Sequence, residues 1–280
     1  MTNAAPLVSA DWLKDHMAAP DVRVVDATWV PPFLVGRRSG FEQYQQGHIP
    51  GAVFFDIDDI ADPDTDLSHM LPDPILFSSR VRQLGLGDGN RIVVYDNNGF
   101  FASARVWWMF RAMGHNDISV LDGGYQAWLA ADGDVEDLPP ITTERHFTSR
   151  KRADLVRDRR EVSAASESNA EILLDARSTG RFDGTAPEPR EGLPSGHIPG
   201  SHSVPVEDLL TPSGKMASEE ALRERLAPYL DKPVITTCGS GVSAAVIALA
   251  LAQIGKWDAA VYDGSWSEWA AQPDSPIATS

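Results

Sequence analysis

The hydrophobic residues of this chain gather in short runs that alternate with stretches of helical pattern. Runs of strand length stand at 92–95 and 234–237, and an apolar helix is predicted from Val242 to Ile254, where Gly255 ends it. Ser9 precedes another helical stretch and has the side chain of an N-cap. This alternation predicts an α/β fold in which helices cover both faces of a parallel sheet.

Several short segments of the sequence occur twice along the chain, in the same order. Val-Val-Asp-Ala at 24–27 returns as Leu-Leu-Asp-Ala at 173–176, and Gly-His-Ile-Pro-Gly at 47–51 returns at 196–200. Both pairs are 149 residues apart, so the register is the same. Two further pairs of segments match at offsets of 142 and 141, namely 92–96 with 234–238 and 121–124 with 262–265. Repetition at this period indicates a duplicated domain.

The duplication, together with the length of 280 residues, predicts two tandem domains of ordinary size. Between the halves lie Pro139, Pro140 and the basic trio at 150–152, a composition typical of a linker. We therefore predict an N-terminal domain over 1–140, a linker over 141–155 and a C-terminal domain over 156–280.

Composition and charge exclude several classes of partner. Hydrophobic residues make up 42% and charged residues 23%, as in an ordinary globular protein. The net charge of −16 repels nucleic acid and anionic membranes, so an anionic ligand needs a local basic pocket. The N-terminus lacks the features of a secretory signal, and the longest apolar run, 244–252, is too short to span a bilayer. We expect a cytoplasmic protein that binds neither nucleic acid nor membranes.

The only cysteine, Cys238, follows the apolar run 234–237 and precedes a Gly-Ser-Gly turn and the apolar helix. A single cysteine excludes an internal disulfide and a four-cysteine zinc site. The carboxyl end of a parallel strand is where ligands bind in α/β sheets, and a helix N-terminus favours an anion. We therefore expect Cys238 to be largely thiolate at neutral pH and to act as a nucleophile. The alternative is an ordinary buried cysteine.

Two segments of the chain resemble the signatures of the rhodanese family, Tyr44–Phe55 at the amino-terminal side and Ala259–Trp269 at the carboxyl-terminal side. The loop 238–244, Cys-Gly-Ser-Gly-Val-Ser-Ala, is similar to that of 3-mercaptopyruvate sulfurtransferases, whereas thiosulfate-specific members carry a basic pair after the cysteine. The resemblance implies two tandem rhodanese-like domains. It also implies that the first is catalytically silent, because Asp96 stands where the second has Cys238.

The resemblance also assigns roles to individual residues. Arg181 and Arg190 match the pair that holds the substrate carboxylate, a task that suits the planar guanidinium fork. Ser240, His69 and Asp58 match a catalytic set that polarises the substrate thiol or moves its proton. The other loop residues that are implied to bind substrate are Gly239, Gly241, Val242 and Ser243. His48 and His197 recur in both halves, and we assign them to the structure of the turn.

The implied reaction transfers the sulfur of 3-mercaptopyruvate to Cys238 as a persulfide, releases pyruvate, and passes the sulfur to cyanide, a small dithiol or reduced thioredoxin. No metal or organic cofactor is implied. Three alternatives stand beside this hypothesis: a thiosulfate sulfurtransferase, a non-catalytic rhodanese-like module, and a cysteine-dependent phosphatase. The uncharged Gly239 and Ser240 disfavour the thiosulfate enzyme, and the retained Cys238 disfavours the non-catalytic module. A phosphatase is disfavoured because Ala244 stands where phosphatases place an arginine.

Overall fold

The computed structural model describes residues 3–280, which form two α/β units. The first unit comprises the chain up to Asp64, Leu71–Arg152 and Pro212–Lys215. The second comprises Thr65–Met70, Ala153–Thr211 and Met216–Ser280. Each half of the chain thus gives a short segment to the other unit.

The first unit contains a five-stranded parallel sheet with the strand order β1-β5-β4-β2-β3. The chain moves outward from β2 to β3 and then returns past β2 to β4, so the direction of winding reverses between β2 and β4. Such a reversal opens a crevice at the carboxyl ends of the two strands. The strands are β1 (Leu7–Val8), β2 (Val22–Asp26), β3 (Val53–Phe54), β4 (Arg91–Tyr95) and β5 (Ile118–Leu121).

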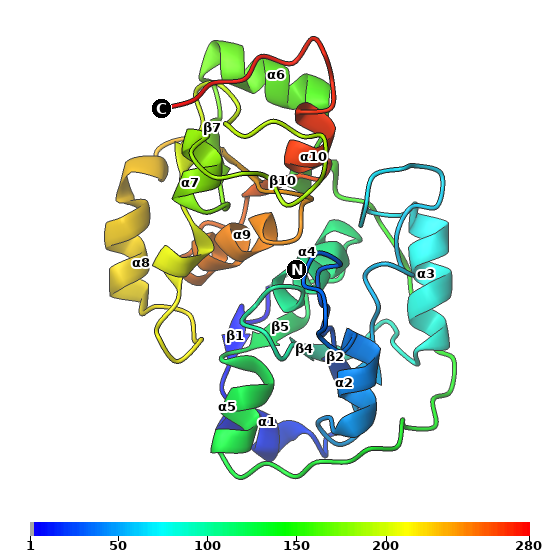
Figure 1. The fold of residues 1–280 in the computed structure, drawn as a ribbon. Coiled ribbons are helices and arrows are strands. Elements are labelled where there is room, and N and C mark those ends of the chain that lie inside the picture. The colour runs from blue at the N-terminus through cyan, green and yellow to red at the C-terminus, as the bar shows by residue number, and fades with distance from the viewer. Residues whose placement is uncertain (1–2) are drawn as a thin grey trace. The chain divides into compact units, whose positions relative to one another are not determined.

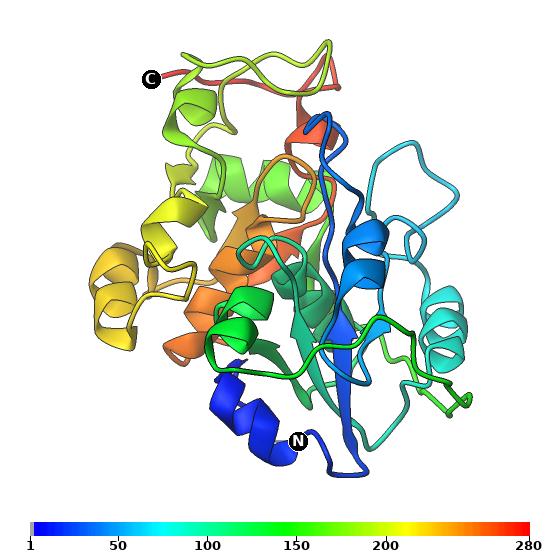
Figure 2. The same ribbon diagram turned by 60° about the horizontal axis from the view of Figure 1, so that its bottom comes forward.

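Helices lie on both sides of this sheet (Figures 1 and 2). Leu13 of α1 and Trp128 of α5 pack on one face with Val24 and Val93. A second cluster joins Phe77 of α3 and Phe110 of α4, with ring centroids 5.2 Å apart. The helices are α1 (Ala10–His16), α2 (Gly40–Gln46), α3 (Pro74–Gln83), α4 (Ser103–Ala112) and α5 (Gly124–Ala130).

The second unit repeats this topology, with the parallel strand order β6-β10-β9-β7-β8. The strands are β6 (Val156–Arg157), β7 (Ile172–Asp175), β8 (His202–Ser203), β9 (Val234–Thr237) and β10 (Ala260–Tyr262). The helices are α6 (Arg159–Ser168), α7 (Thr179–Asp183), α8 (Glu219–Leu226), α9 (Ala244–Gln253) and α10 (Ser265–Trp269). Short 3₁₀ turns are η1 (Ala153–Leu155), η2 (Val206–Leu209) and η3 (Ala227–Tyr229). The predicted α/β class, with a helix-covered parallel sheet in each half, is confirmed.

Local signals in the sequence set the helix ends. The Ser9 hydroxyl accepts the Trp12 N–H at 3.1 Å, as an N-cap does. The apolar helix ends as predicted, since Gly255 is left-handed (φ +95°) and the Lys256 N–H returns to the Leu251 carbonyl. Its predicted start at Val242 is wrong by two residues. Gly241 is left-handed (φ +76°) and the next two residues form a turn, so α9 begins at Ala244.

The segment predicted as a linker, 141–155, runs along the first unit as far as Arg152. Its Phe147 is buried, with its ring centroid 5.7 Å from that of Phe77, and the Arg150 N–H donates to the Met113 carbonyl. The predicted domain limits stay a prediction.

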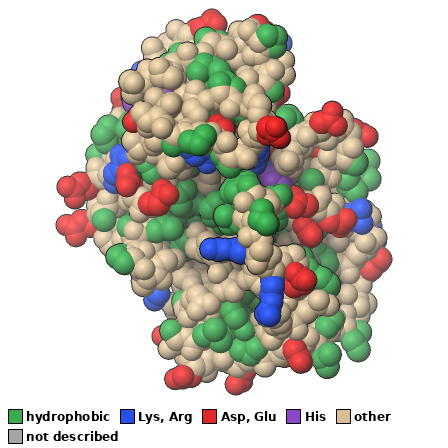
Figure 3. Space-filling model, in the orientation of Figure 1, with side chains coloured by type: hydrophobic (Ala, Val, Ile, Leu, Met, Phe, Trp, Pro, Cys, Tyr) green, Lys and Arg blue, Asp and Glu red, His purple; other side chains and the backbone are tan. Residues whose placement is uncertain are grey.

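Within residues 3–280, none of the helices combines the length and the apolar character that crossing a bilayer requires. Acidic side chains are scattered over the face in Figure 3, in keeping with the net charge of −16.

Candidate active site around Cys238

Cys238 follows β9 directly, and its side chain is buried. Its backbone is held by the turn that opens α10: the Cys238 N–H donates to the Ser265 hydroxyl at 3.2 Å, and the Cys238 carbonyl accepts the Trp266 N–H at 3.0 Å. Ser265 is left-handed (φ +51°) and its hydroxyl donates to the Tyr262 carbonyl. The cysteine therefore sits on a backbone fixed by two strands and the start of a helix.

The loop after Cys238 is tied to the same helix. The Gly239 carbonyl accepts both the backbone N–H of Ser267, at 2.9 Å, and its hydroxyl, at 2.6 Å. Sequence reasoning missed Ser265 and Ser267, although both lie in the segment that resembles the carboxyl-terminal signature. Their effect is to fix the first residues of the loop before any ligand binds.

The two predicted carboxylate-binding arginines come together at Gly239. A Cβ atom added at Gly239 would lie 2.9 Å from Arg190 Nη1 and 3.1 Å from Arg181 Nη2. The Arg190 guanidinium also donates to the Ser240 hydroxyl at 2.7 Å. Five residues predicted from the sequence thus share one site: Cys238, Gly239, Ser240, Arg181 and Arg190. A side chain at 239 would therefore have to displace the guanidinium groups from their present positions.

The electrostatics of Arg190 reflect this position. Burial lowers the pKa of the Arg190 guanidinium below its ordinary value, the charge of Cys238 acts in the opposite direction, and the charge of Arg181 lowers it again. The pair of cations is therefore close enough to interact, and both cations attract an anion that enters beside Cys238.

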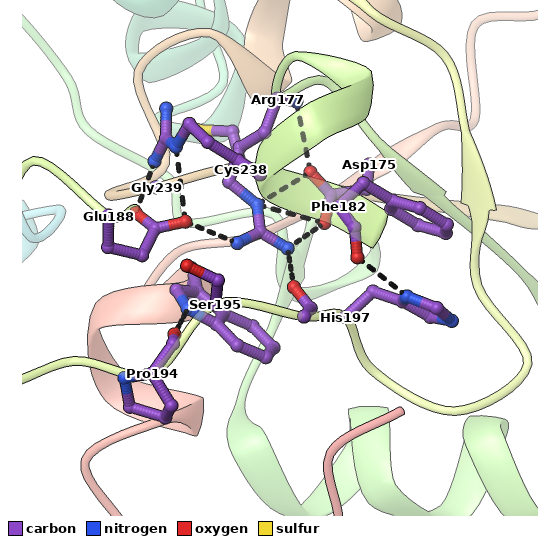
Figure 4. A network of polar contacts seen from close by, with 12 residues as sticks. Asp175, Arg177, Phe182, Glu188, Pro194, Ser195, His197, Cys238 and Gly239 are labelled. Carbon is purple, nitrogen blue, oxygen red and sulfur yellow. Dashed lines mark hydrogen bonds and ion pairs between the residues drawn. The ribbon is translucent and has the colours of Figure 1, made fainter. Parts of the chain in front are cut away.

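Glu188 holds Arg181 in place and was not assigned a role from the sequence. The Arg181 guanidinium donates to Glu188 through Nε (3.1 Å) and Nη2 (2.6 Å), and the Glu188 side chain is only 1% exposed. Glu188 also accepts from Arg177 at 2.7 Å, so one carboxylate bridges two guanidinium groups (Figure 4). Two bonds in this geometry fix the orientation of the Arg181 fork.

Arg177 forms the buried end of this network. Its guanidinium donates to both carboxylate oxygens of Asp175, to the Gly196 carbonyl at 2.7 Å, and lies 4.3 Å from the centroid of the Trp266 ring. Figure 4 shows Arg177 enclosed between Asp175 and Glu188. Arg177 is fully buried, so this network acts as a rigid support for the segment that carries Arg181 and Arg190.

His48 and His197, which recur in the two halves, both make contacts that hold a turn in place, as predicted. His48 Nδ1 lies 2.8 Å from the Tyr44 carbonyl oxygen, and its ring stacks on that of Tyr44. His197 Nδ1 lies 2.9 Å from the Phe182 carbonyl oxygen, and its ring stacks on that of Phe182. Each histidine ties its Ile-Pro-Gly turn to the segment before it.

Asp58 and His69, the other two residues of the predicted catalytic set, lie in different segments of the chain. Asp58 belongs to the first unit, where its carboxylate accepts the indole N–H of Trp29 at 2.8 Å. His69 belongs to the segment Thr65–Met70 of the second unit, is buried, and has a left-handed backbone (φ +64°). Their role with Ser240 stays a prediction.

Asp96 occupies in the first unit the position that Cys238 occupies in the second. Its carboxylate accepts four backbone N–H groups of the following loop, from Asn98, Phe100, Ala102 and Ser103, at 2.8 to 3.2 Å. The Asp96 carbonyl accepts the Tyr125 N–H, as that of Cys238 accepts the Trp266 N–H. The loop that follows the fourth strand of the repeat is therefore built to surround an anion at this position.

We expect Asp96→Asn to leave sulfur transfer nearly unchanged, because the Asp96 carboxylate is occupied by the backbone N–H groups of its own loop and has no predicted role in the reaction. The substitution replaces one acceptor oxygen by a donor and should lower the free energy of unfolding by about 1–3 kcal/mol. His69→Ala and Asp58→Ala should instead lower the rate. The measurement is kcat/KM per folded protein beside thermal unfolding. A severe loss of transfer in folded Asp96→Asn protein would overturn this division of labour.

Comparison with known proteins agrees with the duplication. The rhodanese-like domain family matches residues 9–131 and 158–272. Thiosulfate/3-mercaptopyruvate sulfurtransferase 1, mitochondrial, of Arabidopsis thaliana is 40% identical over 99% of this chain and 79% of the relative. The thiosulfate sulfurtransferase of Rattus norvegicus is 41% identical over 94% of this chain and 91% of the relative.

A solved structure agrees over a similar extent. The crystal structure of SseA from Escherichia coli, described with the rhodanese fold and catalytic mechanism of 3-mercaptopyruvate sulfotransferases, superposes with a TM-score of 0.85. Its sequence identity to this chain is 35%, over 94% of this chain and 99% of that one. The chain belongs to the rhodanese-like family, and each of its halves carries a rhodanese-like domain.

Proposed function

We propose that the protein is a 3-mercaptopyruvate sulfurtransferase that carries sulfur as a persulfide on Cys238. The observation that carries the proposal is the meeting of two guanidinium groups, from Arg181 and Arg190, at the uncharged Gly239 beside the cysteine. This arrangement suits a small monoanion whose carboxylate binds the guanidinium groups while its sulfur reaches Cys238. The description of the Escherichia coli structure supports the same substrate.

The first half-reaction moves one sulfur atom. The Cys238 thiolate attacks the thiol sulfur of 3-mercaptopyruvate, an S–S bond forms, and the C–S bond breaks with its electron pair on carbon. The carbanion is the enolate of pyruvate, and it takes the proton of the former substrate thiol. Pyruvate leaves, and Cys238 keeps an anionic persulfide, which the loop 239–243 would stabilise through its backbone N–H groups as the equivalent loop holds the Asp96 carboxylate.

The second half-reaction restores the thiolate. A thiol acceptor attacks the outer sulfur of the persulfide, forms its own persulfide, and releases Cys238 as the leaving group. Cyanide would accept the same sulfur atom as thiocyanate. A small dithiol or reduced thioredoxin is the proposed physiological type of acceptor, and we propose a cytoplasmic protein without nucleic acid or membrane partners.

Arg190 and Arg181 divide the task of holding the substrate. Arg190 contacts the Ser240 hydroxyl, so its guanidinium is placed directly over the loop. Two donors of Arg181 are engaged by Glu188, which fixes the plane of its guanidinium and leaves other donors for substrate. The charges of Arg177 and Arg181 are matched by those of Asp175 and Glu188, so Arg190 contributes one net positive charge beside the loop.

Thiosulfate is the second candidate substrate, because the Arabidopsis and rat relatives carry its name. Thiosulfate is a dianion and would gain from cations on the loop, where this chain has Gly239 and Ser240. A non-catalytic module is the third candidate. Incubation with 3-mercaptopyruvate and cyanide tests the proposal, since an enzyme releases pyruvate and thiocyanate in equal amounts and a non-catalytic module releases neither.

Replacement of Gly239 by Arg together with Ser240 by Lys is expected to shift the preference toward thiosulfate. The new cations face the second negative charge of thiosulfate, while a side chain at 239 begins 2.9 Å from Arg190 and must displace it. The ratio of the two kcat/KM values should move by roughly tenfold to a hundredfold. Both substrates should be measured on one preparation with persulfide loading checked, and an unmoved ratio would show that loop charge does not set the substrate.

A further inference from the structure

The first unit contains a pocket that the proposed sulfur transfer does not use. Its volume is about 440 Å³, and it is lined by Asp26 at the end of β2, Asn97 just after β4, and side chains of α2 and α5. This is the crevice at which the winding of the first sheet reverses, the usual place for a ligand in such sheets. All of its lining residues belong to the first unit.

Four residues of this pocket are the internal counterparts of Arg177 and its partners. By the offset of 149, Asp26 corresponds to Asp175, Thr28 to Arg177 and Gly47 to Gly196, and by the offset of 141, Tyr125 corresponds to Trp266. In the second unit the Arg177 guanidinium is held by Glu188 at 2.7 Å and by the counterparts of Asp26, Gly47 and Tyr125. These counterparts are the Asp175 carboxylate at 2.6 to 3.1 Å, the Gly196 carbonyl at 2.7 Å, and the Trp266 ring at 4.3 Å.

The first unit keeps the carboxylate of Asp26 and the ring of Tyr125 but has the short Thr28 in place of the arginine, and Ser39 stands where the second unit has Glu188. Asp26 is 3% exposed, lines the pocket, and accepts the Thr28 N–H at 2.8 Å. Burial raises the pKa of Asp26 above its ordinary value, and hydrogen bonds from Thr28 and Tyr95 oppose this shift. The pocket thus lies where the second unit places a buried cation.

We propose that the pocket of the first unit binds a guanidinium group, set against the Asp26 carboxylate, the Gly47 carbonyl and the Tyr125 ring. A planar cation can form two hydrogen bonds to a carboxylate and stack on an aromatic ring at the same time. The strongly negative chain attracts such a cation. The guanidinium has two sources: Arg37 or Arg38, which also line the pocket, or a free ligand that carries this group, such as arginine.

The direct test is titration of the full-length protein with methylguanidinium chloride, followed by ¹H–¹⁵N NMR. We expect saturable shifts confined to Thr28, Gly47, Tyr125 and their neighbours, with a dissociation constant on the order of 1 mM for so small a ligand. Methylammonium chloride is the matched control, because it carries the same charge without the planar donors. Asp26→Asn should weaken binding at least about tenfold.

The double variant Arg37→Gln, Arg38→Gln distinguishes the two sources. Tighter binding of methylguanidinium in this variant identifies the chain's own arginines as the resident group, because a competitor has been removed. Unchanged binding identifies an external ligand. Absence of localised, saturable shifts in both the wild type and the double variant would overturn the proposal, as would equal shifts with methylammonium.

A covalent version of the test places an arginine where the second unit has one. Thr28→Arg should abolish methylguanidinium binding and raise the unfolding temperature by at least about 2 °C relative to Thr28→Gln, which also loses the contact of the Thr28 hydroxyl with the Asn97 N–H. This difference should vanish in the Asp26→Asn background. If Thr28→Arg fails to fold, the titration still decides. The inference does not depend on the proposed sulfur transfer, because the titration measures binding to the first unit whether or not Cys238 is catalytic.

Discussion

Substitution of Cys238 by serine is expected to abolish sulfur transfer while leaving the fold intact. A neutral hydroxyl does not accept sulfur and hold it as a persulfide, so the loss of kcat/KM should be on the order of 10³-fold or more. The change removes no large side chain from a core, and the backbone contacts of residue 238 with Ser265 and Trp266 remain.

Intact-protein mass spectrometry gives the clearest measurement for this variant. After exposure to 3-mercaptopyruvate without an acceptor, the wild type should be heavier by one sulfur atom and Cys238→Ser unchanged. Circular dichroism of both proteins controls for folding. An adduct of equal yield in the serine variant would place the sulfur elsewhere on the chain.

Loss of either substrate arginine should produce the next largest effect. Arg190→Ala removes a guanidinium that lies over Gly239 and contacts Ser240, so the carboxylate loses a charge-assisted partner. The expected fall in kcat/KM for 3-mercaptopyruvate is roughly tenfold to a hundredfold. Arg181→Ala should cause a similar fall and should also lower the unfolding temperature, because the buried Glu188 then keeps only Arg177.

The matched control for this pair is Arg223→Ala. Arg223 lies on α8 of the same unit with its side chain 55% exposed, so the substitution changes the net charge equally without touching the loop. Arg190→Lys separates charge from shape, since lysine keeps the charge but not the fork. Kinetics that stay at the wild-type level in both Arg190→Ala and Arg181→Ala would remove the two arginines from the site.

The duplicated pattern was sufficient to predict the architecture. Strand runs at 92–95 and 234–237 and the repeated Gly-His-Ile-Pro-Gly turn fix which segments form equivalent strands, because period and register are visible in the residues themselves. The position of Cys238 at a strand end followed from the same pattern. Arg181 and Arg190 needed the family resemblance, since arginines in a loop rich in glycine and proline carry no signal by themselves.

The support of the site could not be predicted in the same way. Arg177 donates a hydrogen bond to Glu188, and this pairing depends on how the chain folds back between β7 and the His197 turn. The hydrogen bond from the Cys238 N–H to the Ser265 hydroxyl joins residues 27 positions apart. Local patterns report burial and turns, but they do not report which charged side chains will meet. The same limit applies to Thr65–Met70, which belongs to the second unit although it lies within the first repeat.

The two units show how one loop geometry serves two purposes. In the first, the carboxylate of Asp96 satisfies the backbone N–H groups of its loop and leaves a stable, unreactive centre. In the second, Cys238 stands at the same position, with two guanidinium groups added at Gly239. We propose that this replacement of a fixed carboxylate by a thiol is what distinguishes the catalytic loop from the structural one.

Steady-state kinetics with 3-mercaptopyruvate and thiosulfate, measured side by side on one preparation with cyanide as the common acceptor, tests the proposed function most directly. The uncharged loop and the paired guanidinium groups predict a higher kcat/KM for 3-mercaptopyruvate, with pyruvate released in equal amount to thiocyanate. A higher kcat/KM for thiosulfate, or thiocyanate formed without pyruvate when 3-mercaptopyruvate is the donor, would contradict it.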